Sequence, residues 1–206
     1  MVRAPLSKLQ TEFYTCDDVV EVAQSLLGKV LCTNVDSRLT KAIITETEAY
    51  AGVEDRASHA YGGRRTRRTE PMFAEGGIAY VYLCYGIHHL FNVVTGPPDV
   101  PHAVLVRAGS PFAGIDDMLA RRARAHIDKK LLAGPGSLAR ALGIRTELSG
   151  ASLSGDQVWI EDHEFLVTDD AITAGPRIGI DYAGDDTVRP YRFVIDPDHF
   201  EVGGPR

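Results

Sequence analysis

Hydrophobic positions recur at helical spacing near the N-terminus, and in alternating or short continuous runs through much of the rest of the chain. The segment DDVVEVAQSLLG, residues 17–28, starts with acids and ends at a glycine that can form a C-cap, which predicts a helix of about three turns. The runs KVLCTNV, residues 29–35, and TKAIITETEA, residues 40–49, flank the polar segment DSRL. They predict an antiparallel hairpin.

Strand-like and helix-like segments follow in the middle of the chain. IAYVYLCYGIHHLFNVVTG, residues 78–96, predicts two strands with a turn near Tyr85, and HAVLVRAGSP, residues 102–111, predicts a third. GIDDMLARRARAH, residues 114–126, predicts an amphipathic helix whose charges follow the helix dipole. AGPGSLARALGI, residues 133–144, predicts a Gly-Pro-Gly turn that opens a short helix.

Four strand-like runs occupy the last third of the chain: QVWIED, EFLVTDD, PRIGIDY and YRFVID, at residues 157–162, 164–170, 176–182 and 191–196. The segment AGDDTVRP, residues 183–190, is interpreted as a loop and not as a domain linker. The whole pattern predicts an α+β fold in which a few helices surround a mainly antiparallel sheet. We expect a single domain over residues 1–206.

Composition narrows the class of protein. At 206 residues and 44% hydrophobic content, the chain can bury a substantial core. No apolar run approaches the roughly 20 residues of a membrane helix, and the N-terminus lacks a signal-peptide pattern, so we expect a cytoplasmic protein with no membrane partner. Cys16, Cys32 and Cys84 have no paired spacing, which favours reduced core residues over disulfides or a metal clamp.

Residues 51–77 show no sustained period and are too long to be a simple connection. Within them, residues 56–68 contain no acid and five arginines: Arg56, Arg64, Arg65, Arg67 and Arg68. The chain as a whole has a net charge of −6, so positive charge is concentrated here. The segment is either a solvated loop or a surface that binds the phosphates of a nucleic acid.

Strand alternation would place four side chains on one face: Ile44, Glu46, Glu48 and Tyr50. The two carboxylates could act as acid and base, bind a metal together with Asp55 or His59, or simply end an exposed strand. No recurrent zinc spacing is present, so we expect neither a metal nor another cofactor.

Flat and polar side chains that suit a nucleic-acid base follow within the next segments. Tyr80 and Tyr82 would share a strand face, and such a stripe is either core or a stacking surface. The amide of Asn92 either satisfies a backbone group or recognises a ligand edge. Arg107 is either a surface charge or the buried partner of a carboxylate.

Seven segments occur in the order seen in a known family: LLGKVL, ETEAYAGVEDRASHAYGGRRTRR, MFAEGGIAYVYLCYGIHHLFNVV, AVLVRAGSP, GPGSLARALGI, GPRIGIDYAG and RPYRFVI. From about residue 22 to residue 195, the chain resembles a bacterial member of the alkyladenine (3-methyladenine) DNA glycosylase family. The resemblance implies a curved antiparallel sheet from which a tyrosine-tipped β-hairpin protrudes to enter the minor groove of DNA.

The resemblance also implies an activity. The protein would flip a damaged purine, of the 3-methyladenine, 7-methylguanine, hypoxanthine or ethenoadenine class, out of double-stranded DNA. It would then hydrolyse the N-glycosidic bond in base-excision repair and leave an abasic site. We expect a monofunctional enzyme, because no lysine lies between Glu46 and Asn92 to support lyase chemistry. We also expect a monomer associated with the nucleoid through DNA.

Residue roles follow from the resemblance by position. Glu48 would activate water, with Arg107 beside the water site. Asn92 would screen against the amino group of guanine, and Tyr85 would fill the gap in the duplex. Three side chains would sandwich the flipped base: Tyr50, His59 and Tyr82. The arginines expected to contact DNA are Arg64, Arg65, Arg67 and Arg68.

The sequence departs from the family pattern at Thr69, Ser137 and Tyr191, where relatives commonly have Asn, Lys and Trp. The change at Ser137 removes a possible phosphate contact, and the change at Thr69 could alter the arginine-rich loop. Two other functions remain open: a binding module for damaged or single-stranded nucleic acid without catalysis, and a metal-dependent hydrolase that uses Glu46, Glu48 and His59.

Overall fold

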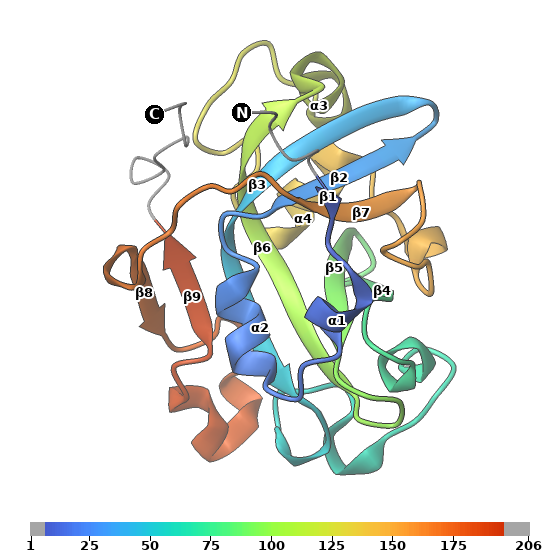
Figure 1. The fold of residues 1–206 in the computed structure, drawn as a ribbon, viewed down its shortest axis with the longest axis vertical. Helices are drawn as coiled ribbons and strands as arrows, with labels where there is room; N and C mark the ends of the chain where they lie inside the picture. The colour runs from blue at the N-terminus through green and yellow to red at the C-terminus, as the bar shows by residue number, and fades with distance from the viewer. Residues whose placement is uncertain (1–6, 196–206) are drawn as a thin grey trace.

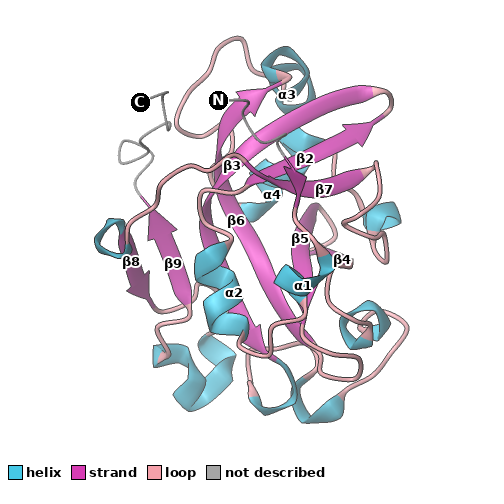
Figure 2. Cartoon of the chain, viewed as in Figure 1, coloured by secondary structure: helices cyan, strands magenta, loops and turns pink. Residues whose placement is uncertain are grey.

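The computed structural model describes residues 7–195 of the chain (Figure 1). Within this part, nine strands form one strongly curved sheet, and all their pairings are antiparallel (Figure 2). The strands are β1 (Ser7–Lys8), β2 (Val30–Val35), β3 (Arg38–Ala51), β4 (Ala79–Cys84), β5 (His88–Thr95), β6 (His102–Ala113), β7 (Val158–Asp162), β8 (Ile172–Gly175) and β9 (Arg192–Ile195). Their order is β1-β7-β2-β3-β6-β5-β4, with β9 paired to β3 and β8 to β9. The predicted α+β class is confirmed.

Four short α-helices accompany the sheet: α1 (Thr11–Tyr14), α2 (Val19–Ser25), α3 (Ile115–Arg122) and α4 (Pro135–Leu142). Short 3₁₀ segments cover Gly52–Glu54, Tyr61–Gly63, Glu70–Phe73, Thr146–Leu148, Asp169–Ala171 and Asp181–Val188. The long strands β3 and β6 run side by side through the molecule, and α2 lies against them (Figure 1).

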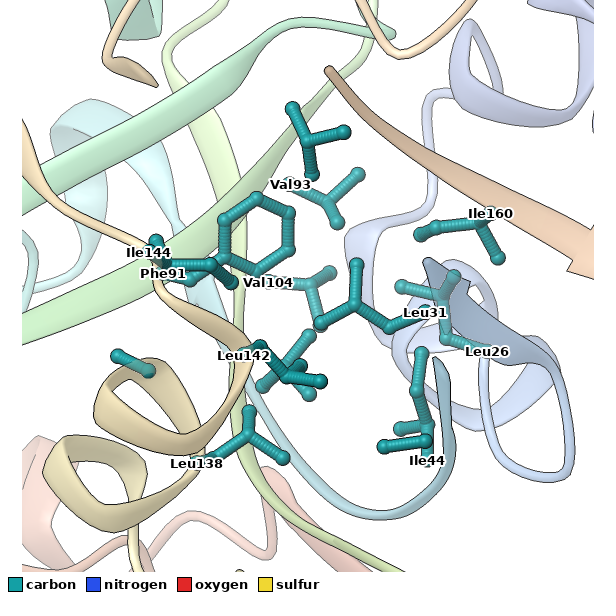
Figure 3. Packing of buried hydrophobic residues seen from close by; sticks show 14 of the residues in the cluster. Leu26, Leu31, Ile44, Phe91, Val93, Val104, Leu138, Leu142, Ile144 and Ile160 are labelled. Atoms are coloured by element: carbon teal, nitrogen blue, oxygen red, sulfur yellow. The ribbon is translucent and has the colours of Figure 1, made fainter. Parts of the chain in front are cut away.

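The main hydrophobic core joins the sheet to α2 and α4. Buried side chains from β2, β3, β5, β6 and β7 meet Leu138 and Leu142 of α4 and Leu26 at the end of α2 (Figure 3). Burying one such leucine contributes about 1.5–3 kcal/mol. The core therefore holds the sheet in its curve and fixes where the strand ends lie.

Most predicted elements are present. The helix predicted over residues 17–28 is α2, which begins where the Asp18 carboxylate accepts the N–H groups of Val20 and Glu21. The two predicted hairpins are β2–β3 and β4–β5. The helix predicted over residues 114–126 ends at Arg122, because Ala123 adopts a left-handed conformation.

Two predicted strands are wrong. EFLVTDD forms a loop and the start of a 3₁₀ turn, and the strand of this region is β8, which the pattern missed. PRIGIDY is not paired to another strand. It contains Gly179 at φ 76°, and the N–H of Ile178 donates to a carboxylate instead of a strand.

The face predicted for Ile44 is also wrong. Ile44 pairs with Gly109 and Glu46 with Ala108, so Thr45 is an extra residue in β3 and the strict alternation breaks there. Ile44 therefore packs in the main core beside Leu26 and Leu31 (Figure 3), away from the two acids. Glu46 and Glu48 do share a face, since both contact one arginine.

A buried ion pair ties the loop after β3 to the segment after β8. The side chains of Asp55 and Arg177 are both fully buried. Nη2 of Arg177 lies 2.8 Å from Oδ1 of Asp55. Asp55 also accepts the N–H groups of Ala51 and Ala57 at 3.0 Å. Burial alone would raise the pKa of Asp55, but the hydrogen bonds from Arg177 and these amides outweigh it and lower the pKa.

We predict that Asp55→Asn lowers the free energy of unfolding by about 3–5 kcal/mol, because it leaves the Arg177 charge buried without a partner. Urea denaturation measures the change. The folded-state pKa of Asp55 is depressed, so the stabilisation is present above the unfolded value of about 3.9 and disappears as the pH falls below it. Asp156→Asn, at an exposed pair with Lys8, is the control and should not shift the transition. Equal effects of the two variants would contradict the prediction.

Candidate active site

A cavity of about 590 Å³ opens between the end of β3, the β4–β5 hairpin, the start of α4 and the segment after β8. The seven aromatic rings in its lining are Tyr50, His59, Tyr80, Tyr82, Tyr85, His88 and Tyr182. Asn92, Arg107 and Arg68 add polar groups. The structure thus brings together residues that the sequence places on five separate segments.

The carboxylate of Glu48 lies fully buried directly behind this lining. Its Oε1 accepts the N–H of Ile178 at 2.8 Å. Its Oε2 accepts the hydroxyl of Tyr50 at 2.9 Å and Nη1 of Arg107 at 3.2 Å. A carboxylate has about four acceptor positions, so these three bonds leave one position on Oε1 for a further donor.

Arg107 is the buried partner of both acids and is not a surface charge. Its Nε lies 2.9 Å from Oε1 of Glu46, while its Nη1 reaches Glu48. Arg192 of β9 donates to the same Glu46 oxygen at 2.6 Å. Glu46 therefore holds Arg107 in place from behind and is not itself one of the residues that line the cavity.

Tyr50 connects the carboxylate to the cavity. Burial, and secondly the nearby Glu48 charge, raise the pKa of Tyr50 well above its usual value, so the phenol stays protonated and donates to Glu48. The guanidinium of Arg177 lies 4.8 Å from the Tyr50 ring centre and packs against it. This packing fixes the ring orientation.

His59, Tyr80 and Tyr82 form a second aromatic wall. His59 and Tyr82 meet edge to face, with ring centres 4.6 Å apart, so no base fits between these two rings. Nδ1 of His59 lies 2.8 Å from the Tyr80 hydroxyl, which sets the ring orientation. Burial, and secondly the charges of Arg68 and Arg64, lower the pKa of His59 to about 4, so His59 is neutral at physiological pH.

The arginine-rich loop is divided in its roles. The Arg68 guanidinium lies 5.0 Å from the Tyr82 ring centre and lines the cavity. Arg65 pairs with Glu70 and Asp99, so its charge is largely compensated. Arg64 and Arg67 are exposed and form no ion pair with any described residue.

The remaining predicted site residues lie on the β4–β5 hairpin. Asn92 is buried, lines the cavity and donates from Nδ2 to the carbonyl of Tyr80 at 3.0 Å. Tyr85 sits at the hairpin tip with φ 51° and is 89% exposed, and nearby Ile87 is 71% exposed. Two large, solvent-exposed side chains at one turn indicate an interaction surface.

Three contributors to the site were missed by the sequence patterns: Arg177, the backbone N–H of Ile178, and Tyr182, whose exposed ring lines the cavity. An arginine inside an apolar run bounded by proline and glycine was the available signal for Arg177. All three lie within PRIGIDY, a segment whose composition predicts a strand.

The metal alternative has no ligand set among residues 7–195, where no three His, Cys, Asp or Glu side chains are grouped to hold an ion. Asp55 instead pairs with Arg177.

The expectation of core cysteines holds only for Cys32, since Cys16 and Cys84 are half-buried. No helix in the described part of the chain has the length and apolar character needed to cross a membrane.

The three departures from the family pattern have structural partners. Thr69 is buried, donates to the Arg64 carbonyl and accepts the Thr66 N–H, which fixes the turn of the arginine-rich loop. The hydroxyl of Ser137 accepts Nη2 of Arg122 at 3.0 Å. Tyr191 packs against the guanidinium of Arg177, 5.4 Å from its ring centre.

A buried carboxylate behind an aromatic cavity, next to a hairpin with an exposed tyrosine tip, suits an enzyme that acts on a base extruded from a nucleic-acid duplex. Residues 12–199 match the family described as "Methylpurine-DNA glycosylase (MPG)". A Chlamydia abortus protein named "Putative 3-methyladenine DNA glycosylase" is 49% identical over 188 residues, 91% of this chain and 97% of the relative. A Bacillus cereus protein of the same name is 48% identical over 187 residues, 87% of this chain and 91% of the relative.

The chain therefore belongs to the methylpurine-DNA glycosylase family. Membership makes it a DNA glycosylase of base-excision repair, with DNA as its binding partner.

We predict that the NMR signal of His59 stays at its neutral position from about pH 7 to pH 5 and moves only near pH 4. Because this pKa lies below the usual value of about 6.5, the unfolded chain binds the proton first, and stability falls as the pH drops from about 6.5 towards 4. A histidine ring titration by NMR, with the signal assigned through His59→Gln, measures this. A midpoint above pH 6 would contradict the burial argument.

Proposed function

We propose that the protein excises damaged purines from double-stranded DNA by adding a water activated by Glu48. The substrates are purines of the 3-methyladenine, 7-methylguanine, hypoxanthine and ethenoadenine class. The observation that carries the proposal is the buried Glu48 carboxylate, which Arg107, Tyr50 and the Ile178 N–H hold at the cavity lining.

Glu48 acts as the general base in this mechanism. A water bound at the open position of Oε1 gives its proton to the carboxylate while its oxygen bonds to C1′ of the sugar. The bond between C1′ and the purine breaks, and its electron pair leaves with the base. The negative carboxylate also stabilises the positive charge that develops on the sugar. Such base catalysis contributes about 10²–10⁴-fold in rate.

The aromatic walls hold the extruded base. Tyr50 forms one wall, and the His59–Tyr82 pair forms the other. Stacking contributes about 1–3 kcal/mol per base, which offsets the few kcal/mol needed to flip the nucleotide. Tyr85 fills the gap left in the duplex, and Asn92 rejects a purine that carries the amino group of guanine.

The product is an abasic site, and the strand stays intact. A lyase would need an amine nucleophile to form a Schiff base with the sugar. No lysine lies in the cavity lining, and none occurs in the sequence between Glu46 and Asn92. We therefore infer monofunctional glycosylase chemistry.

We predict that Glu48→Gln lowers the single-turnover excision rate by about 10²–10⁴-fold, because glutamine cannot take the proton of water. The protein is incubated, with chelator present, with duplexes that contain hypoxanthine, ethenoadenine or alkylated purines. Alkali then cleaves the strand at each abasic site, and the cleaved strand is measured. Binding of the same duplexes should persist. Glu54→Gln, an exposed acid outside the cavity lining, is the matched control and should keep full activity.

Each alternative has its own outcome in this experiment. Undiminished turnover by Glu48→Gln would remove Glu48 from its role. Binding of lesion duplexes by the wild-type protein without product would establish the binding module. Product that disappears only when chelator is added would establish a metal-dependent reaction.

We predict that Tyr85→Ala reduces the preference for a lesion duplex over an undamaged duplex, because the wedge that keeps the nucleotide extruded is lost. Fluorescence anisotropy with both duplexes measures the ratio of affinities. Tyr61→Ala, at another exposed tyrosine outside the cavity, is the control and should retain the ratio. An unchanged ratio in Tyr85→Ala would exclude the wedge role.

A further inference from the structure

We propose that a second basic groove, formed by α3, α4 and the turn between β2 and β3, binds the phosphodiester backbone of the duplex beside the flipped nucleotide. The groove encloses about 730 Å³ and lies next to the hairpin. Its lining includes Arg38, Arg121, Arg122, Arg140 and Arg145, with Asp36 as its one acid among the lining residues. The proposal rests on the proposed function, because the hairpin must enter DNA for the groove to reach it.

Four of the five arginines lack a carboxylate partner among residues 7–195. Arg121 donates to the carbonyls of Val35 and Ala141, and Nε of Arg140 donates to the carbonyl of Arg121. Arg122 donates to the carbonyl of Leu131. These bonds fix the guanidinium groups without neutralising their charge.

Arg145 and Arg140 are the most available cations. Both are exposed, and neither forms an ion pair with a described residue. Arg38, in contrast, pairs with Asp117 at 3.1 Å. Burial lowers the pKa of Arg121 and Arg122. The charges of Arg124 and Arg140 lower the pKa of Arg122 further, whereas Asp117 and Asp36 oppose the lowering of the Arg121 pKa by Arg38 and Arg145. The groove therefore holds positive charges that repel one another and that its nearby acids only partly compensate. A polyanion would relieve this repulsion.

The groove lies directly beside the active-site cavity. His88 and Gly136 line both spaces, and Ile87 lines the groove two residues from the hairpin tip. A Cβ on Gly136 would lie 2.8 Å from Nδ1 of His88, so glycine is what allows α4 to approach the hairpin this closely. If Tyr85 inserts into the base stack of a duplex, the base pairs on one side of the insertion therefore lie close to the groove.

The occupant we infer is the DNA backbone because its charges repeat. B-DNA carries one phosphate charge per about 1.7 Å of axis, which can engage several guanidinium groups along one groove. The arginine-rich loop lines the cavity but not the groove, and its Arg68 lies over the Tyr82 ring. The two basic surfaces would then grip the duplex on either side of the hairpin.

The double variant Arg140→Gln/Arg145→Gln tests the proposal by binding to undamaged duplex across a salt series. Loss of two phosphate contacts should reduce the slope of log affinity against log salt by about 1.8, so that a fourfold rise in salt weakens the wild-type protein about twelvefold more than the variant. Lys129→Gln/Lys130→Gln removes the same charge outside the groove lining and should keep the wild-type slope.

Position on the duplex gives a second measurement. Two duplexes of equal length, with the lesion near the 5′ end or near the 3′ end, should bind the wild-type protein with unequal affinity, because only one extends over the groove. The double variant should lose this asymmetry. Arg145→Gln alone keeps the Arg140 bond to α3 and should lower the salt slope by about 1 if the double variant fails to fold.

A wild-type salt slope in both groove variants would overturn the proposal. A different outcome would assign the groove to a free phosphate ligand. In that case inorganic phosphate would stabilise the wild-type protein against unfolding but not the double variant, and the salt slope for DNA binding would be the same for both proteins. Failure of the proposed function appears separately, as absence of excision by the wild-type protein, whereas binding to undamaged duplex requires no chemistry.

Discussion

The buried ion pair between Asp55 and Arg177 holds the candidate active site together. It joins two segments 122 residues apart in the sequence, and both charges are out of contact with water. Arg177 packs on Tyr50, and the next residue, Ile178, presents its N–H to Glu48. A buried pair is favourable only while both partners and their hydrogen bonds are in place. The position of Glu48 therefore depends on an interaction that never touches the cavity itself.

Two irregularities in the sheet place the acids opposite their arginine. Thr45 is an extra residue in β3, and Arg107 is skipped in the register of β6, where Ala108 and Val106 pair with Glu46 and Thr47. Regular pairing would continue the face of Ile44, which packs in the core. The bulges turn Glu46 and Glu48 to the other face, where Arg107 reaches both. The bulges that break the alternation of side chains thus also create the polar site within a mainly hydrophobic sheet.

The spacing of hydrophobic residues was sufficient to predict the helices and strands whose positions are set by burial in the core. The α2 helix, the β2–β3 and β4–β5 hairpins and the β6 strand were all predictable, because their burial follows from local spacing. The N–H of Ile178 was not, since a backbone donor leaves no side-chain pattern. Nor was the basic groove, because its arginines come from the start of β3, α3, α4 and the residues after α4. The run PRIGIDY has strand composition, yet tertiary contacts of Arg177 and Ile178 decide its conformation.

The charges of the candidate site suit the proposed substrate, a cationic or neutral purine ring held near the negative carboxylate of Glu48. Burial keeps His59 neutral, so this ring adds no positive charge to the cavity lining. Tyr50 and Tyr82 offer ring faces that attract cations. The positive side chains that do line the cavity have other partners, since Arg107 bonds both acids and Arg68 lies on Tyr82. A chain of net charge −6 can therefore concentrate positive charge in its arginine-rich segments, while the arginine behind the cavity is compensated by the two acids that it contacts.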